Sequence, residues 1–117
     1  MEIKPPPSVP ESEYSLQFLQ GMVDRMGNSY ATYGLLAEAF PHPVNALACL
    51  QDRLAKYVGS GNTEWLMDVA NFAMIEFMRP RHPDAHYRPT GSHESPGRRW
   101  DGEIDPSVRP TNPKRWG

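Results

Sequence analysis

The positions of the prolines constrain the fold of this chain more than any other sequence feature. Prolines crowd into residues 5–10 (PPPSVP) and into the segment after Arg79, and between them only Pro41 and Pro43 interrupt the chain. Because proline lacks a backbone N–H and its ring clashes with the preceding helical turn, long helices can form only in the middle. We therefore expect three parts: an extended Pro-rich leader (1–10), a helical core domain (11–79) and an extended Pro/Arg-rich tail (80–117).

Apolar residues in the middle part recur at helical spacing in three stretches. The first expected helix starts at Ser12 and is weakened or interrupted at Gly34. The second covers about residues 44–58, and the third begins at a cap on Asn62 or Thr63 and runs to about Met78. No strand pattern competes with them. The predicted fold class is all-α, a small antiparallel helical bundle of three main helices.

The size of this core predicts that it needs support from outside one chain. A core built from residues 11–79 is marginal without disulfides, a metal or a partner. Cys49 is the only cysteine, so no disulfide can form within the chain. The third expected helix is apolar over too wide an arc for two neighbouring helices to cover. We therefore expect a homo-oligomer that buries the remainder.

Charge and hydropathy limit the kinds of partner that this chain is expected to bind. The sequence shows no N-terminal signal region and no apolar run near the roughly 18 residues that a membrane span needs, so we expect no membrane contact and a cytoplasmic protein. Residues 1–78 carry four basic and nine acidic residues, and residues 79–117 carry eight basic and five acidic ones. The interleaved acids of the tail argue against nucleic-acid binding. Trp100, Ile104 and Trp116 are instead candidates to anchor the tail on another surface, either a neighbouring subunit or a protein partner.

The third expected helix carries a narrow polar line on an otherwise apolar surface. Glu64, Asp68 and Asn71 stand at i, i+4 and i+7, which places them within an arc of about 60°. Two carboxylates at this spacing repel each other unless a positive charge lies between them. The line therefore predicts a cation at this position.

Three interpretations of this line remain open. In the structural one, Asp68 pairs with Arg53 or Arg25 and Asn71 satisfies a backbone group. In the second, Glu64 and Asp68 bind a hard cation, since carboxylates and an amide oxygen suit Mg²⁺ or Mn²⁺ bridged to substrate phosphates. In the third, the line is a polar register device at a helix interface.

The run LQDRLAKYVGSGNTEWLMDVANFAMIEFM (residues 50–78) resembles small phage proteins linked to nucleotide modification, and it resembles the metal-binding helix of MazG-like all-α nucleotide pyrophosphohydrolases. The longer stretch from YATYGLLAEAFP to HESPGR is similar to uncharacterised proteins of actinobacterial phages. The resemblance covers about residues 14–99. It implies a helical fold, oligomerisation, the cytoplasm of a bacterial host and Mg²⁺-dependent cleavage of a nucleoside triphosphate to monophosphate and pyrophosphate.

The resemblance also implies roles for residues. Glu64 and Asp68 would bind Mg²⁺ or Mn²⁺, although that family has Glu-x-x-Asp where this chain has Glu64-x-x-x-Asp68, and the preceding helix has no Glu-x-x-Glu pair. A site here would therefore hold one ion. The expected substrate-binding and catalytic residues are Asn71, Arg53 and Lys56 for the nucleotide and Glu38 for the hydrolytic water. The alternative is a non-enzymatic phage accessory protein whose core oligomerises and whose tails dock on a partner.

Overall fold

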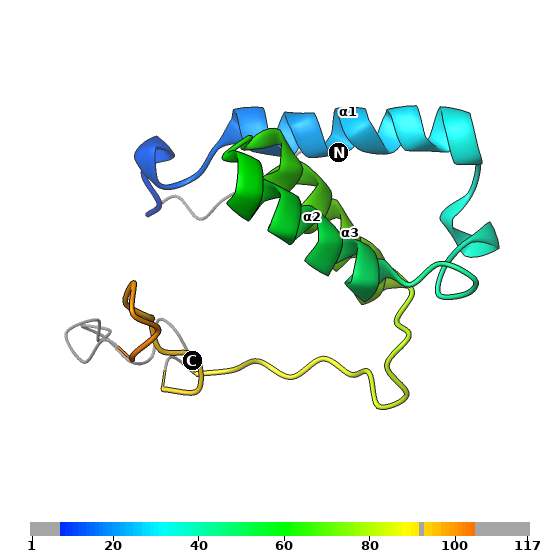
Figure 1. Cartoon of the computed structure of the whole chain (residues 1–117). Helices are drawn as coiled ribbons and strands as arrows, with labels where there is room; N and C mark the ends of the chain where they lie inside the picture. Colours follow the sequence, from blue (N-terminus) through cyan, green and yellow to red (C-terminus); the bar gives the residue numbers. More distant parts are fainter. Residues whose placement is uncertain (1–7, 92, 105–117) are drawn as a thin grey trace. The chain divides into compact units, whose positions relative to one another are not determined.

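The computed structural model describes residues 8–91 and 93–104 (Figure 1). These residues fall into two units, one that ends at Pro83 and one that begins at Asp84. Most of the expected leader and Trp116 lie outside the described residues.

The regular structure of the N-terminal unit is all helical, which confirms the predicted all-α class. Its helices are α1 (Leu16–Tyr33), α2 (Ala46–Ser60) and α3 (Glu64–Met78), with short 3-10 turns η1 (Glu11–Glu13) and η2 (Leu36–Glu38). No strand occurs within residues 8–91 and 93–104. None of the described helices is long and apolar enough to cross a membrane.

The first helix begins later than the predicted start at Ser12. The Ser15 hydroxyl accepts a hydrogen bond from the backbone N–H of Phe18 at 3.0 Å, so α1 begins at Leu16. Glu11, Ser12 and Glu13 form η1, and Tyr14 has extended backbone angles between η1 and α1. A serine cap close to an apolar run decides the start more strongly than acidic residues further upstream.

The second helix is shifted by two residues, to 46–60, because Asn45 caps it. The side-chain oxygen of Asn45 accepts hydrogen bonds from the backbone N–H groups of Leu47 and Ala48. The third helix begins where expected. There the side chain of Asn62 accepts from the N–H of Glu64 at 3.1 Å, whereas Thr63 makes no side-chain capping bond.

Two glycines end helices with backbone angles that other residues adopt at a cost. Gly34 follows α1 with φ of 82°, and Gly61 follows α2 with φ of 74°. A positive φ turns the chain out of the helix without the clash that a Cβ atom would cause. The predicted interruption at Gly34 is confirmed, and Gly61 sets the tight turn into α3.

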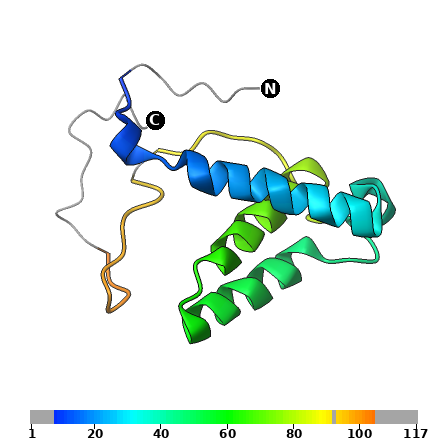
Figure 2. The same ribbon diagram turned by 90° about the horizontal axis from the view of Figure 1, so that it is seen from above.

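The helices α2 and α3 form an antiparallel hairpin, and α1 lies across it, against α3 (Figures 1 and 2). Gly21 lies at the crossing. A Cβ atom on Gly21 would stand 2.5 Å from the sulfur of Met67, well inside van der Waals contact. Although this glycine weakens α1 as an isolated helix, its missing side chain lets α3 approach closely.

The N-terminal unit buries very little of its apolar surface. Among the described residues, the buried apolar side chains are Ala46 and Ile75, and the buried polar one is Asn71. Large exposed apolar side chains occur on all three helices and on the connection after α1: Leu16, Val23, Tyr30, Tyr33, Leu35, Leu47, Leu54, Val58, Phe77 and Met78. The three helices therefore do not enclose a core of ordinary size.

The C-terminal unit has little regular structure over the part that is described. Arg88 forms an ion pair with Glu94 at 2.7 Å. Arg98 and Ile104 form an isolated antiparallel bridge. Trp100, in the turn between these two residues, is fully exposed within this unit.

Candidate functional site

The guanidinium group of Arg25 binds both carboxylates of the polar line on α3. Its Nε donates to Asp68 Oδ1 at 2.6 Å, and its Nη2 donates to Asp68 Oδ2 at 2.9 Å. The third nitrogen, Nη1, donates to Glu64 Oε1. A single side chain from α1 thus supplies the positive charge that two carboxylates at i and i+4 require.

The three side chains of this ion-pair network are partly exposed to solvent. The exposed fraction of the side chain is 17% for Asp68, 31% for Arg25 and 60% for Glu64. The hydrogen bonds with Asp68 are the largest cause that raises the pKa of Arg25 above its already high ordinary value, and the charge of Glu64 adds to it. Arg25 is therefore a permanent cation, and its fork matches the planar carboxylate of Asp68.

The basic residues of α2 are also engaged. Arg53 pairs with Asp52, lies 3.9 Å from Asp68 Oδ2 through its Nε, and stands over the ring of Phe72 at 5.4 Å from its centre. The hydrogen bond from Arg53 is the largest cause that lowers the pKa of Asp52.

Lys56 is held one turn further along α2. Its ammonium group lies 3.5 Å from Asp52 Oδ2 and 5.1 Å from the centre of the Trp65 ring. Both residues predicted to meet a phosphate, Arg53 and Lys56, therefore already have carboxylate and aromatic partners within the unit.

Asn71 joins α3 to the backbone of α1. Its Nδ2 donates to the carbonyl oxygen of Met22 at 3.0 Å, while its Oδ1 is buried without a hydrogen-bond partner. Together with the pairing of Asp68 and Arg25, this bond supplies both contacts that the structural interpretation of the polar line predicts. Asn71 is thus a buried link between two helices.

The residues proposed for a metal do not gather into a set that suits Mg²⁺. Glu38 lies in η2, where its carboxylate is close to Gly34, 3.3 Å from the position of a Cβ atom there. Among the described residues no group of three or more His, Cys, Asp or Glu side chains is arranged to hold a metal ion. Glu64 and Asp68 therefore offer two carboxylates without a third, and both are bound to Arg25.

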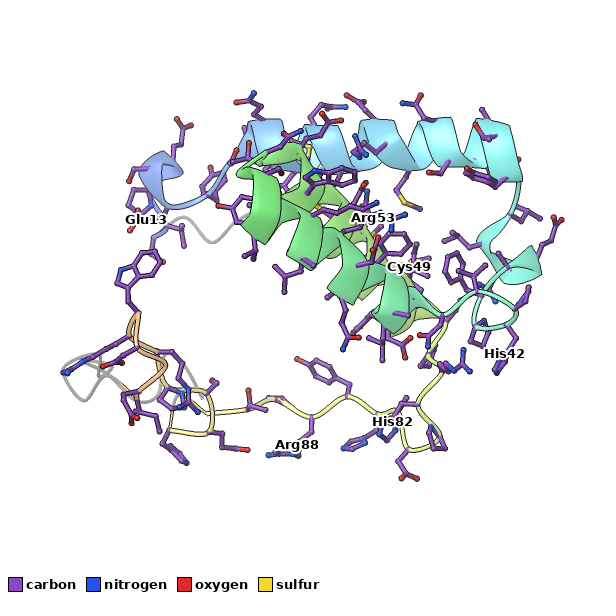
Figure 3. All side chains as sticks on the ribbon, viewed as in Figure 1. Glu13, His42, Cys49, Arg53, His82 and Arg88 are labelled. Atoms are coloured by element: carbon purple, nitrogen blue, oxygen red, sulfur yellow. The ribbon has the colours of Figure 1, made fainter. Side chains whose placement is uncertain are left out.

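Arg25, Glu64 and Asp68 together form the Arg25 cluster. An open groove of about 1020 Å³ adjoins this cluster. Its walls come from the second half of α1, from the connection that follows it, and from the facing sides of α2 and α3. The lining is mostly apolar, and the charged and amide side chains that also border it are Arg25, Asn28, Arg53, Asp68, Asn71 and Arg79. Cys49 and Arg53, both labelled in Figure 3, belong to the α2 side of the groove.

Comparisons with protein-family models, with curated protein sequences and with solved structures each find no match. The fold and the site describe a small all-α unit that carries an arginine-centred cluster of ion pairs beside a largely apolar groove. The resemblance to phage proteins and to pyrophosphohydrolases stays a prediction.

Two residues of α1 give a weak indication in the sequence of which face of this helix meets α3. Arg25 is the only basic residue between Lys4 and Arg53, so it is the obvious partner from the first helix for an acidic line elsewhere. Gly21 stands four residues before it, on the same face of α1. This pairing of a small residue with a lone cation indicates the face of α1 that meets α3.

Proposed function

We propose that this chain is a non-enzymatic interaction protein whose helical unit associates with further copies of itself. One observation carries the proposal: the described part of the unit buries two apolar side chains, Ala46 and Ile75, while large apolar side chains stay exposed on every helix. In soluble proteins, large exposed apolar patches commonly mark surfaces that bind another protein.

Burial of apolar side chains has to offset the entropy cost of ordering the chain. Full burial of a large aliphatic or aromatic side chain contributes about 1.5–3 kcal/mol. Ordering the backbone costs about 1–2 kcal/mol per residue, so a helical unit needs many such side chains to be stable. Association lets the exposed residues of one copy serve as the missing core of another, and the stability then depends on protein concentration.

In this proposal the Arg25 cluster has a structural role. The fork between Arg25 and Asp68 and the bond from Asn71 to the Met22 carbonyl hold α1 at a set position on α3. An interface made of two helices keeps its shape only if their crossing is fixed. The polar line therefore acts as a register device, a role for which polar groups within apolar interfaces are known.

The test is a measurement of molar mass by light scattering or sedimentation over about a hundredfold range of protein concentration. The expected result is a mass that is a multiple of the 13.2 kDa of one chain, with an unfolding midpoint that rises with concentration. A monomer that unfolds cooperatively at every concentration would overturn the proposal.

The metal-dependent nucleotide hypothesis makes a different prediction for the same protein. A Mg²⁺ ion on Glu64 and Asp68 would first have to displace Arg25 from three hydrogen bonds. We therefore expect no change in melting temperature with Mg²⁺ or Mn²⁺, alone or with each nucleoside triphosphate. A metal-dependent rise that disappears in Asp68→Asn would favour the hydrolase instead.

The tail is assigned to a second protein partner and not to self-association. Support for this comes from Trp100, which is fully exposed within its own unit and belongs to a residue type enriched at the energetic centres of interfaces. Trp100→Ala should accordingly leave the mass of the oligomer unchanged. A dissociated oligomer in this variant would place the tail in the self-association surface.

A further inference from the structure

We infer that the groove beside the Arg25 cluster is the self-association surface, and that it receives the second half of α1 and the connection after it from a second copy of this chain. This inference rests on the proposed function and specifies where the two copies meet. The arrangement is two-fold, so that each copy inserts the same segment, residues 26–37, into the groove of the other.

The groove has the dimensions and chemistry of a helix-binding surface. Its volume of about 1020 Å³ slightly exceeds the range of about 300–1,000 Å³ that is typical of small-molecule sites. Five apolar residues that line it keep most of their surface open: Val23 is 64% exposed, Tyr30 62%, Tyr33 79%, Leu35 56% and Met78 55%. An apolar wall that is concave and exposed over such an area suits the apolar face of a helix about 10 Å wide.

The charges of the groove favour an uncharged occupant. Arg25 is paired with Asp68 and Glu64, and Arg53 is paired with its acidic neighbour within its own copy. Neither guanidinium requires a carboxylate from outside, and Arg79, the further cation of the lining, is exposed beyond the last turn of α3. An occupant with charged side chains would lose their hydration without gaining an opposite charge, which is costly in an apolar setting.

Residues 26–37 (MGNSYATYGLLA) meet this requirement. They form a run of twelve residues without an acidic or basic side chain. The run carries Tyr30, Tyr33 and Leu35, each more than half exposed in one copy. Its hydroxyl and amide groups can hydrogen-bond across an interface without leaving a charge unpaired.

The same run also satisfies the symmetry of a two-fold dimer. In such a dimer one patch must serve as both the inserting and the receiving surface. Residues 26–37 provide one wall of the groove and project exposed apolar side chains from it. In the N-terminal unit, the large exposed apolar residues outside the groove lining are spread over all three helices: Leu16, Leu47, Leu54, Val58 and Phe77.

A matched pair of variants of the full chain tests the inference. Val23 lines the groove and is 64% exposed, whereas Val58 lies in α2 outside the groove lining and is 76% exposed. Val23→Asp should raise the dissociation constant at least about a hundredfold, since it buries a carboxylate in the apolar interface. Val58→Asp, which makes the same chemical change on a helix, should leave the constant within about threefold of the parent.

Cys49 supplies a second readout, because it is the only thiol in the chain and it lines the groove. Its reaction with a maleimide should be slow in the parent protein and in Val58→Asp, and faster in Val23→Asp. If Val23→Asp loses its helical circular dichroism, Tyr33→Ser takes its place. The Tyr33 side chain is 79% exposed, so this change removes contacts to a second copy and few within its own.

The outcomes separate the two proposals. A monomeric parent protein would overturn the proposed function itself. A parent oligomer that survives in both Val23→Asp and Tyr33→Ser would overturn the groove as the interface while leaving self-association intact. Dissociation by Val58→Asp, with Val23→Asp still associated, would overturn the inference and move the interface to the outer side of α2.

Discussion

Arg25 in α1 forms a forked pair with Asp68 in α3, and the two residues stand 43 positions apart in the chain. Within one turn of Arg25, Gly21 accommodates Met67 and the Met22 carbonyl accepts a hydrogen bond from Asn71. The contact between α1 and the hairpin thus combines one close approach with several polar bonds. This attachment explains why a largely apolar helix carries a line of two carboxylates and an amide.

Removal of the Arg25 fork should destabilise the unit. Arg25→Gln leaves Glu64 and Asp68 as like charges at i and i+4, and hydrogen bonds to charged groups contribute about 1.5–3 kcal/mol each in proteins. Because the cluster is partly exposed, we expect a total loss of about 1–3 kcal/mol in the free energy of unfolding. Urea unfolding at one fixed protein concentration measures it.

Two further variants control this prediction. Arg25→Lys keeps the charge but not the planar fork, so its loss should be intermediate. Arg53→Gln removes a guanidinium whose Nε lies 3.9 Å from Asp68, so its loss should be smaller than that of Arg25→Gln. Equal losses in Arg25→Gln and Arg53→Gln would contradict the central position of Arg25.

Asn71 should tolerate replacement by leucine better than by alanine. Its Oδ1 is buried without a partner, and an unsatisfied buried polar atom costs about 1–3 kcal/mol. Asn71→Leu removes that atom and fills the space, which offsets the lost bond to Met22. Asn71→Ala leaves a cavity instead, so thermal unfolding should show the alanine variant as the less stable of the two. The opposite order would show that the site does not accommodate the leucine side chain.

The glycines at the end of α2 should respond in opposite directions. Gly59 lies within the helix, and a Cβ atom added there would meet no atom within 4 Å, so Gly59→Ala should stabilise the unit by about 0.5–1 kcal/mol. Gly61 has φ of 74°, where a Cβ atom is strained, so Gly61→Ala should destabilise it by about 1 kcal/mol. Paired melting curves measure both, and a shift of the same sign in both variants would contradict the assigned helix end.

The pair between Asp52 and Arg53 should weaken in acid. The pKa of Asp52 is lowered in the folded state from an ordinary value of 3.8, so the folded state binds this proton more weakly than the unfolded state does. The contribution is complete above the ordinary value and is lost as pH falls through the lowered one. The small difference in urea midpoint between the parent and Asp52→Asn should therefore be smaller at a pH well below 3.8 than at pH 7. An unchanged difference at both pH values would argue against the pair.

Local features of this protein follow from the sequence alone. The three helices, the break at Gly34 and the line of Glu64, Asp68 and Asn71 all depend on periodicity, capping and backbone angles within a few residues. The exact helix starts do not follow in the same way, since Ser15 and Asn45 compete as caps with residues a few positions upstream. Such competition is decided by side-chain geometry within one turn.

Only the tertiary structure decided which cation meets the carboxylates and where the uncovered apolar surface lies. Both depend on how α1 crosses α3, and that crossing is set by contacts between residues that are far apart in the chain, such as Gly21 with Met67 and Arg25 with Asp68. Helical periodicity identifies the face that each helix buries or exposes, but the partner of that face is a property of the packed helices together.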